Sequence, residues 1–225
     1  NSQTANAISL HLGLVPEGRE NDVLNSLVED IRSRDNGLTA GDVGYRYVLR
    51  ALEEGGRTDV IFDMNSSYDK PGYGWQLAHG ATALTESWQA FDYKSNNHLM
   101  LGHLAEWLYT GLCGLRQADG SVAFRHTLVD PQPVGDITSA SATYESPYGP
   151  IGVSWCIEDG EYTVDVEIPA NATSTVMLPT SNISAVTEYG TPLLQASGVT
   201  GISHQGEDRL AVTVGSGKYR FNVKK

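Results

Sequence analysis

The stretch HLMLGHLAEWLYTGLCGLRQADGSVAF, residues 98–124, changes its hydrophobic period halfway along. In its first part the leucines fall at spacings that build one face of a helix: Leu101, Leu104, Leu108, Leu112 and Leu115. After Gly114 the apolar residues Val122 and Phe124 alternate with other residues, which is the period of a β-strand. The sequence therefore predicts a long helix over 98–115 and a β-rich domain after it.

The residues before this stretch keep the helical period. We predict a first helix with Ala5, Ile8 and Leu12 on one face, stopped by Gly13 and Pro16. A second helix is predicted from a cap at Asn21 to a stop at Asn36-Gly37, and a third over 41–54. A fourth, short helix is predicted to start near Thr58. A fifth is predicted after Gly80, with Leu84, Trp88 and Phe91 on one face. The segment NSSYDKPGYGW, residues 65–75, is predicted as an aromatic-bearing loop. Six helices joined by short turns are typical of three helical hairpins.

The second half of the chain consists of short alternating runs separated by turn signals such as Asp159-Gly160. The clearest runs cover residues 151–157, 162–168, 210–214 and 219–223. Several such runs are typical of an antiparallel β-sandwich. The predicted fold is therefore α + β and multidomain, with helices in 1–115 and a sandwich in 116–225.

The acidic charge of the chain is spread along its length. Residues 1–115 carry 15 acidic and 8 basic side chains, and residues 116–225 carry 12 and 7. Neither half offers the basic surface that neutralises phosphates, so we expect no nucleic-acid partner. No run of about 18 apolar residues is present, so we expect no membrane span.

The sequence lacks the common motifs for nucleotide binding, serine hydrolysis and zinc proteolysis. Of the histidines, His98 and His103 come closest to a metal spacing, but on a helix they would not share a face, so we expect no metal and no other cofactor. Carboxylates, histidines and aromatic side chains remain, which is the set that glycoside hydrolases use. Glu86, after the small residues 80–83, and Glu106 stand out by their apolar surroundings. Because most helical glutamates face solvent, this pattern alone does not choose between them.

Three blocks of the helical half resemble consecutive blocks of the catalytic domain of inverting bacterial α-L-rhamnosidases. They are LTAGDVGYRYVLRALEEGGRTD (38–59), GYGWQLAHGATALTESW (72–88) and SNNHLMLGHLAEWLY (95–109). The segments GLRQADG (114–120) and ESPYGPIGVSWCIEDGEYTVDVEIPANATSTVMLP (145–179) are similar to the C-terminal β-sandwich of that family. The resemblance covers nearly the whole chain, in order.

The resemblance implies a six-hairpin (α/α) toroid that removes terminal α-L-rhamnose from glycans or glycosides with inversion. The family's general base is the glutamate of its Gly-Ala-Thr…Glu-x-Trp block, which matches Glu86. The histidine of the Ser-x-Asn-His block contacts the bound rhamnose in the family, and it matches His98. Trp75 is a candidate for a wall of the sugar pocket. Thr85 and Gln89 stand where the family often has an aromatic and an acidic residue, which leaves the linkage and the leaving group open.

Two neighbouring residues are predicted to be structural. Trp88 lies four positions after Leu84, so we expect it in the core. Glu106 is expected to tie the last helix to the sandwich.

The family's general acid lies upstream of these blocks, and the chain shows no counterpart of it. We therefore expect this chain to be the C-terminal part of a longer enzyme, in which the missing N-terminal part completes the ring. Such enzymes commonly act outside the cytoplasm, which favours a periplasmic or extracellular location. Two alternatives stay open: another inverting (α/α)-toroid glycosidase, such as an α-L-fucosidase or a disaccharide hydrolase, and a non-catalytic carbohydrate-binding module.

Overall fold

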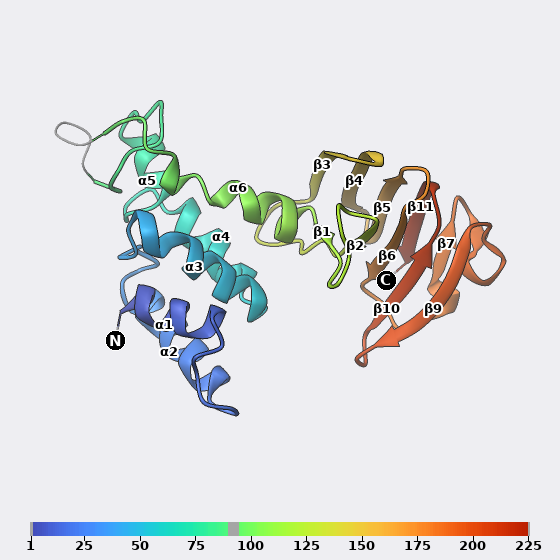
Figure 1. Cartoon of the computed structure of the whole chain (residues 1–225), viewed down its shortest axis with the longest axis horizontal. Coiled ribbons are helices and arrows are strands. Elements are labelled where there is room, and N and C mark those ends of the chain that lie inside the picture. The colour runs from blue at the N-terminus through green and yellow to red at the C-terminus, as the bar shows by residue number, and fades with distance from the viewer. Residues whose placement is uncertain (1, 90–94, 225) are drawn as a thin grey trace. The chain divides into compact units, whose positions relative to one another are not determined.

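Figure 1 shows the computed structural model of the chain, which describes residues 2–89 and 95–224. The chain divides into two compact units, Asn1–Trp107 and Leu108–Lys225, which we call the helical unit and the sandwich unit. Helices followed by two sheets confirm the predicted fold class, part of a helical toroid and then a β-sandwich. Within the described residues, no helix has the length and apolar character needed to cross a membrane.

The first four helices form where the apolar period predicts them. They are α1 (Gln3–His11), α2 (Glu20–Ser33), α3 (Asp42–Glu54) and α4 (Thr58–Ser66). Leu27 and Ile31 of α2, together with Val48 and Leu52 of α3, are fully buried. One apolar stripe on each helix thus faces the core of the helical unit, as expected of amphipathic helices.

The predicted cap of α2 at Asn21 is wrong. The helix already begins at Glu20, and Arg19 occupies the cap position without a side-chain hydrogen bond. Glu20 and Asp22 lie in the first turn, where their carboxylates compensate the positive end of the helix dipole. Charge at the first turn therefore stabilises this helix end in place of a capping side chain.

The predicted fifth helix after Gly80 is also wrong. A short helix, α5 (Tyr73–Ala78), begins instead inside the segment predicted as a loop and ends before Gly80, and residues 81–89 contain no helix. Gly80 follows α5 with a φ of +82°, a left-handed conformation that glycine adopts at little cost. Beyond it, residues 84–86 pair with residues 95–98, which uses the backbone groups that a helix would need. Phe91, predicted on the helix face, lies outside the described residues.

The predicted long helix over 98–115 breaks into short pieces. They are the 3-10 turn η1 (Leu99–Leu101), the helix α6 (Leu104–Trp107) and the π-helical turn η2 (Leu108–Leu112). Leu115 already belongs to the first strand. Gly102 marks the first break, where the chain turns so tightly that an added Cβ would lie 2.9 Å from the Leu99 carbonyl oxygen. Leu108 is 41% exposed, so the predicted leucine seam does not form one buried face.

The sandwich unit contains two sheets. The first has the order β1 (Leu115–Gln117), β2 (His126–Val129), β6 (Thr173–Leu178), β10 (Arg209–Val214) and β9 (Val199–Gln205). The second has the order β3 (Ser139–Ser146), β4 (Gly149–Glu158), β5 (Glu161–Ile168), β11 (Gly217–Lys224), β7 (Val186–Glu188) and β8 (Thr191–Pro192). Two 3-10 turns, η3 (Ile183–Ala185) and η4 (Leu193–Gln195), connect the later strands. The strand pairs are antiparallel apart from β2 with β6, which run parallel.

Alternation decides which face of each strand is buried. In β5, Tyr162, Val164, Val166 and Ile168 are buried while the residues between them are partly exposed. The same period buries one face of β4 and β11, and in β10 it buries Leu210, Val212 and Val214 together with Ala211 of the other face. The strands predicted from these runs are confirmed. The buried faces make the core of the sandwich unit.

The strand predicted from the alternation of Val122 and Phe124 is wrong. Both residues lie in a turn that the amide of Arg125 closes on the carbonyl of Val122 at 3.1 Å. Ala123 and Phe124 have positive φ angles, and Val122 is 77% exposed. An alternation of only two apolar residues is too short to distinguish a strand from a turn.

A buried carboxylate holds one end of the first sheet together. Asp130, which follows β2, is 8% exposed. Its Oδ2 accepts a hydrogen bond at 2.8 Å from Nη2 of Arg116 on β1, and its Oδ1 accepts one from Nη2 of Arg209 on β10. One carboxylate therefore ties together strands that are far apart in the sequence.

Candidate active site

Glu86 lies in a segment without regular secondary structure that pairs with a second segment. Its amide donates a hydrogen bond to the Ser95 carbonyl at 2.9 Å, and its Oε2 accepts one from the Ser95 amide at 3.3 Å. The residue is half-buried. Both the backbone and the carboxylate of Glu86 are thus hydrogen-bonded to Ser95. These two contacts fix the direction of the side chain more firmly than it would be fixed on the exposed face of a helix.

The same pairing holds His98. The amide of His98 donates to the Leu84 carbonyl at 2.9 Å, so residues 84–86 and 95–98 run antiparallel. Its imidazole is half-buried, and Nε2 lies 3.3 Å from Oδ2 of Asp42. The two residues that the sequence singled out are therefore placed on two paired segments of the helical unit.

Two buried polar side chains, Gln76 and Thr85, hold the segment that carries Glu86. Nε2 of Gln76 donates to Oγ1 of Thr85 at 2.6 Å, and Thr85 in turn donates to the Ser87 carbonyl at 2.7 Å. Gln76 is 3% exposed and Thr85 is 1% exposed. The hydroxyl of Thr85 therefore joins Gln76 of α5 to Ser87, so the residues on both sides of Glu86 are connected to α5.

Replacing Gln76 by alanine is expected to lower the free energy of unfolding of the helical unit by about 1–3 kcal/mol, because Thr85 loses a buried partner. Urea unfolding followed by circular dichroism measures the change. Gln89→Ala is the matched control, since Gln89 is exposed in the same segment and should have no measurable effect. Equal stability of the two variants would show that the Gln76–Thr85 contact does not support this segment.

Trp75 is not among the residues that line two hollows beside residues 81–84. Its ring stacks on His79 with centroids 4.0 Å apart and an angle of 24° between the planes. One hollow, of about 310 Å³, is lined by His79, Gly80, Ala81, Thr82, Ala83, Thr85 and Asn96. The other, of about 440 Å³, is lined by Tyr73, Gln76, Leu77, Ala81, Thr82, Ala83 and Leu84. Trp75 contributes to neither lining, so its role as a wall of a sugar pocket stays a prediction.

The prediction that Trp88 belongs to the core is confirmed. Its side chain is 5% exposed, its Nε1 donates to the Ala40 carbonyl at 2.8 Å, and its ring meets Tyr45 edge to face at 4.9 Å. Tyr73 packs against the same indole, and burial raises its pKa to about 12. The protonated hydroxyl of Tyr73 then donates to the Leu101 carbonyl. These contacts anchor the chain two residues after Glu86 and attach the start of α5 to the same core.

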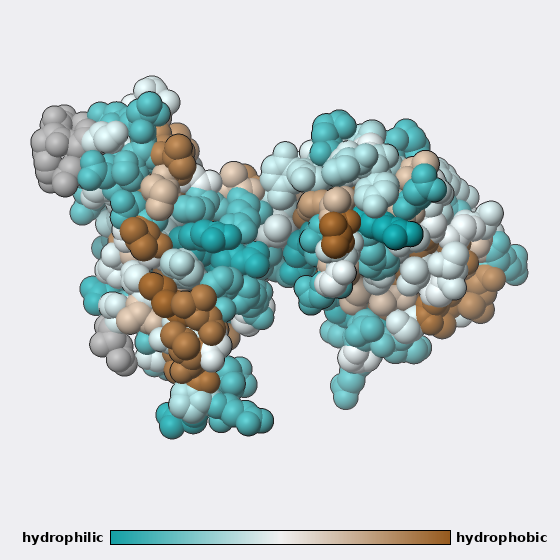
Figure 2. Space-filling model, viewed as in Figure 1, coloured by the Kyte–Doolittle hydropathy of each residue, from teal (hydrophilic) through white to brown (hydrophobic). Residues whose placement is uncertain are grey.

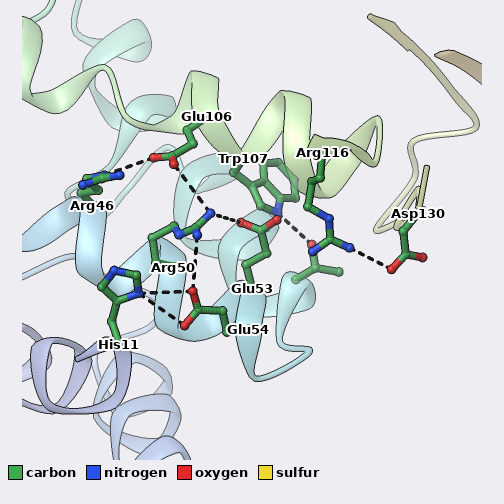
Figure 3. A network of polar contacts seen from close by, with 10 residues as sticks. His11, Arg46, Arg50, Glu53, Glu54, Glu106, Trp107, Arg116 and Asp130 are labelled. Atoms are coloured by element: carbon green, nitrogen blue, oxygen red, sulfur yellow. Dashed lines mark hydrogen bonds and ion pairs between the residues drawn. The ribbon is translucent and has the colours of Figure 1, made fainter. Parts of the chain in front are cut away.

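Glu106 is held in a network of ion pairs (Figure 3). Its carboxylate lies 3.2 Å from Nε of Arg46 and 3.6 Å from Nη1 of Arg50, both on α3. The hydrogen bond that Arg46 donates to this carboxylate raises the pKa of Arg46. Glu54 extends the network by pairing with Arg50 at 3.5 Å and with His11 of α1 at 3.2 Å. These pairs tie α6 and α1 to α3, which gives Glu106 a structural role within the helical unit.

Asp42 and Gln76 are site residues that the sequence pattern did not reveal. Asp42 contacts His98, which is 56 positions later in the sequence. Gln76 contacts Thr85, a residue that no motif singles out. No spacing rule links either residue to its partner. Among residues 2–89 and 95–224, no group of three or more histidines, cysteines or acidic residues is arranged to hold a metal ion.

Comparison with known families assigns both parts of the chain to one group of enzymes. Residues 1–112 match the bacterial α-L-rhamnosidase six-hairpin glycosidase domain, and residues 114–191 match the bacterial α-L-rhamnosidase C-terminal domain. The α-L-rhamnosidase of Streptomyces avermitilis is 29% identical over 232 residues, which cover 99% of this chain and 21% of that protein.

Solved structures agree with this assignment. The α-L-rhamnosidase from Dictyoglumus thermophilum superposes on the full chain with a TM-score of 0.89 and 29% identity, and the match covers 26% of that enzyme. The Streptomyces avermitilis α-L-rhamnosidase complexed with L-rhamnose gives a TM-score of 0.88 and 28% identity over 99% of this chain and 21% of its own. The chain thus spans about a quarter or less of the relatives it matches. It belongs to the bacterial α-L-rhamnosidase family.

Proposed function

We propose that the protein containing this chain is a glycoside hydrolase that removes terminal α-L-rhamnose from glycans or glycosides with inversion of configuration. Family membership over both units supports the reaction class. The observation that carries the proposal is the backbone pairing of residues 84–86 with 95–98, which holds Glu86 and His98 on adjacent segments.

In this proposal Glu86 is the general base. An inverting hydrolase needs one carboxylate that takes a proton from water and one carboxylic acid, roughly 6.5–9.5 Å away, that protonates the leaving oxygen. Glu86 is half-buried and attached to Ser95 through both its amide and its carboxylate, so it is oriented while still accessible to water. His98 binds a hydroxyl of the sugar and holds the ring against the attacking water.

The general acid comes from the rest of the polypeptide. Figure 2 shows apolar surface gathered over α1 and α2 of the helical unit. Leu12, Leu14 and Val43 of this unit are 54%, 67% and 61% exposed. Exposed apolar area of this kind commonly marks an interaction surface. The remaining hairpins of the ring cover it and bring the acid to face Glu86.

A panel of nitrophenyl glycosides assayed with the full-length enzyme tests the proposal. We expect release of nitrophenol from the α-L-rhamnoside and not from the α-L-fucoside, with β-L-rhamnose as the first anomer seen by NMR. The 225-residue chain alone should show no turnover. Preference for the fucoside would favour the other inverting toroid glycosidases. Rhamnose binding without hydrolysis by the full-length protein would favour the carbohydrate-binding module. The periplasmic or extracellular location stays a prediction.

A further inference from the structure

Asp42 is held with its carboxylate directed at His98. It is the first residue of α3, where the helix dipole favours a negative charge. Its Oδ1 accepts a hydrogen bond from the Val43 amide at 2.8 Å, and its Oδ2 lies 3.3 Å from Nε2 of His98. One oxygen therefore fixes the carboxylate on its own helix, while the other faces the imidazole of a residue 56 positions later.

The backbone on both sides of this contact is anchored. The loop before α3 is held by Oε1 of the buried Gln3, which accepts from the Thr39 amide at 2.9 Å, and by the indole of Trp88, which donates to the Ala40 carbonyl at 2.8 Å. The amide of His98 is held by the Leu84 carbonyl at 2.9 Å. Trp88 follows Glu86 by two residues, so the segment that carries the proposed base also places the helix end that carries Asp42.

The contact decides which imidazole nitrogen carries the proton. An ionised carboxylate only accepts hydrogen bonds, so Nε2 of His98 must be the donor. In a neutral imidazole the other nitrogen, Nδ1, is then an acceptor. No hydrogen bond reaches Nδ1 from residues 2–89 or 95–224, and 27% of the side-chain surface is exposed. The geometry leaves Nδ1 available to a ligand that donates.

We propose that Asp42 is a positioning residue that fixes the tautomer of His98, so that Nδ1 accepts a hydrogen bond from a hydroxyl of the bound sugar. The inference rests on the proposed function, because it requires that His98 bind the substrate. It assigns a direction to that contact: the sugar donates and the histidine accepts. Asp42 acts through His98 and does not touch the sugar.

Kinetics of the full-length enzyme on an aryl α-L-rhamnoside test the inference. Asp42→Ala should lower kcat/KM by about 10- to 100-fold, which corresponds to losing a hydrogen bond to a charged group. Asp42→Asn keeps an acceptor oxygen without the charge, so its loss should be smaller, about 3- to 10-fold. Asp22→Ala is the matched control, since Asp22 also lies in the first turn of a helix but is exposed and pairs with Arg19. It should keep kcat/KM within about twofold.

A double-mutant cycle separates positioning from a general structural effect. In a His98→Ala background, Asp42→Ala should cause no further loss, because its effect passes through the imidazole. The same loss in both backgrounds would overturn the inference while leaving the proposed function intact. Absence of rhamnoside turnover by the unaltered enzyme would instead contradict the proposed function.

A spectroscopic measurement tests the tautomer without reference to activity. In long-range ¹H–¹⁵N NMR of the histidine-labelled protein, assigned with His98→Ala, the proton should be found on Nε2 of His98. Asp42→Ala should shift the signals towards a mixture of the two tautomers. A proton on Nδ1 in the unaltered protein would overturn the inference.

Discussion

Replacing Glu86 by glutamine lowers kcat of the full-length enzyme on an aryl α-L-rhamnoside by about 10²–10⁴-fold, the range expected when a general base is lost. An amide cannot take the proton of the attacking water. The melting temperature should change little, because the glutamine Oε1 can still accept the hydrogen bond that the Ser95 amide donates to the carboxylate. Steady-state kinetics and a thermal melt of the same preparations measure the two quantities.

Glu106→Gln is the control for this prediction. It also replaces a partly buried glutamate of the helical unit, but one that pairs with Arg46 and Arg50 on α3. We expect it to lower stability while kcat stays within about threefold, because Glu106 takes no part in the proposed chemistry. If Glu86→Gln keeps full turnover, or if Glu106→Gln loses as much, Glu86 is not the base.

Replacing Asp130 by asparagine is expected to lower the free energy of unfolding of the sandwich unit by about 2–4 kcal/mol. Arg116 and Arg209 would then lose the carboxylate that both bind. Because Asp130 is only 8% exposed, water replaces that carboxylate poorly. Urea unfolding gives the loss, and hydrogen exchange of β1, β2 and β10 locates it. Faster exchange at these three strands, compared with β4 and β5, is the expected pattern.

Glu167→Gln is the matched control in the sandwich unit. Glu167 of β5 pairs with Lys218 of β11 at 3.2 Å, and the two side chains are 44% and 71% exposed. An exposed pair of this kind contributes about 0–1 kcal/mol, so its loss should be small. Equal losses of free energy of unfolding in the two variants would show that burial does not strengthen the contacts of Asp130 with Arg116 and Arg209.

Elements with a long one-sided apolar pattern could be predicted from the sequence. The stripe of Leu27, Val28 and Ile31 on α2 is buried, and so is the alternation along β5. Patterns of this kind are decided locally, because the same residues that set the period also make the core.

Breaks in these patterns could not be predicted. The leucines of 98–115 have a helical spacing, yet Gly102 and the π-helical turn η2 interrupt the helix. The apolar residues after Gly80 also have that spacing, but the backbone pairing with residues 95–98 competes successfully with a helix. The second outcome depends on a contact between two segments of the chain, which overrides local propensity.

For the candidate site, the resemblance supplied Glu86 and His98, and the structure added the residues that orient them. Asp42 is 56 positions from its partner, and Gln76 meets Thr85 only because α5 packs against the following segment. Polar contacts of this kind leave no periodic trace, so only coordinates reveal them. The predicted role of Trp75 has no such support, since its ring stacks on His79.

Hydrogen bonds of residues 84, 86, 95 and 98 attach the Glu86 segment to its neighbour, so the direction of the carboxylate does not depend on the winding of a helix. On a helix, each added residue would rotate everything beyond it by about 100° relative to the preceding turns. A change of chain length before residue 84 that keeps these four residues paired would therefore leave the direction of the Glu86 side chain unchanged.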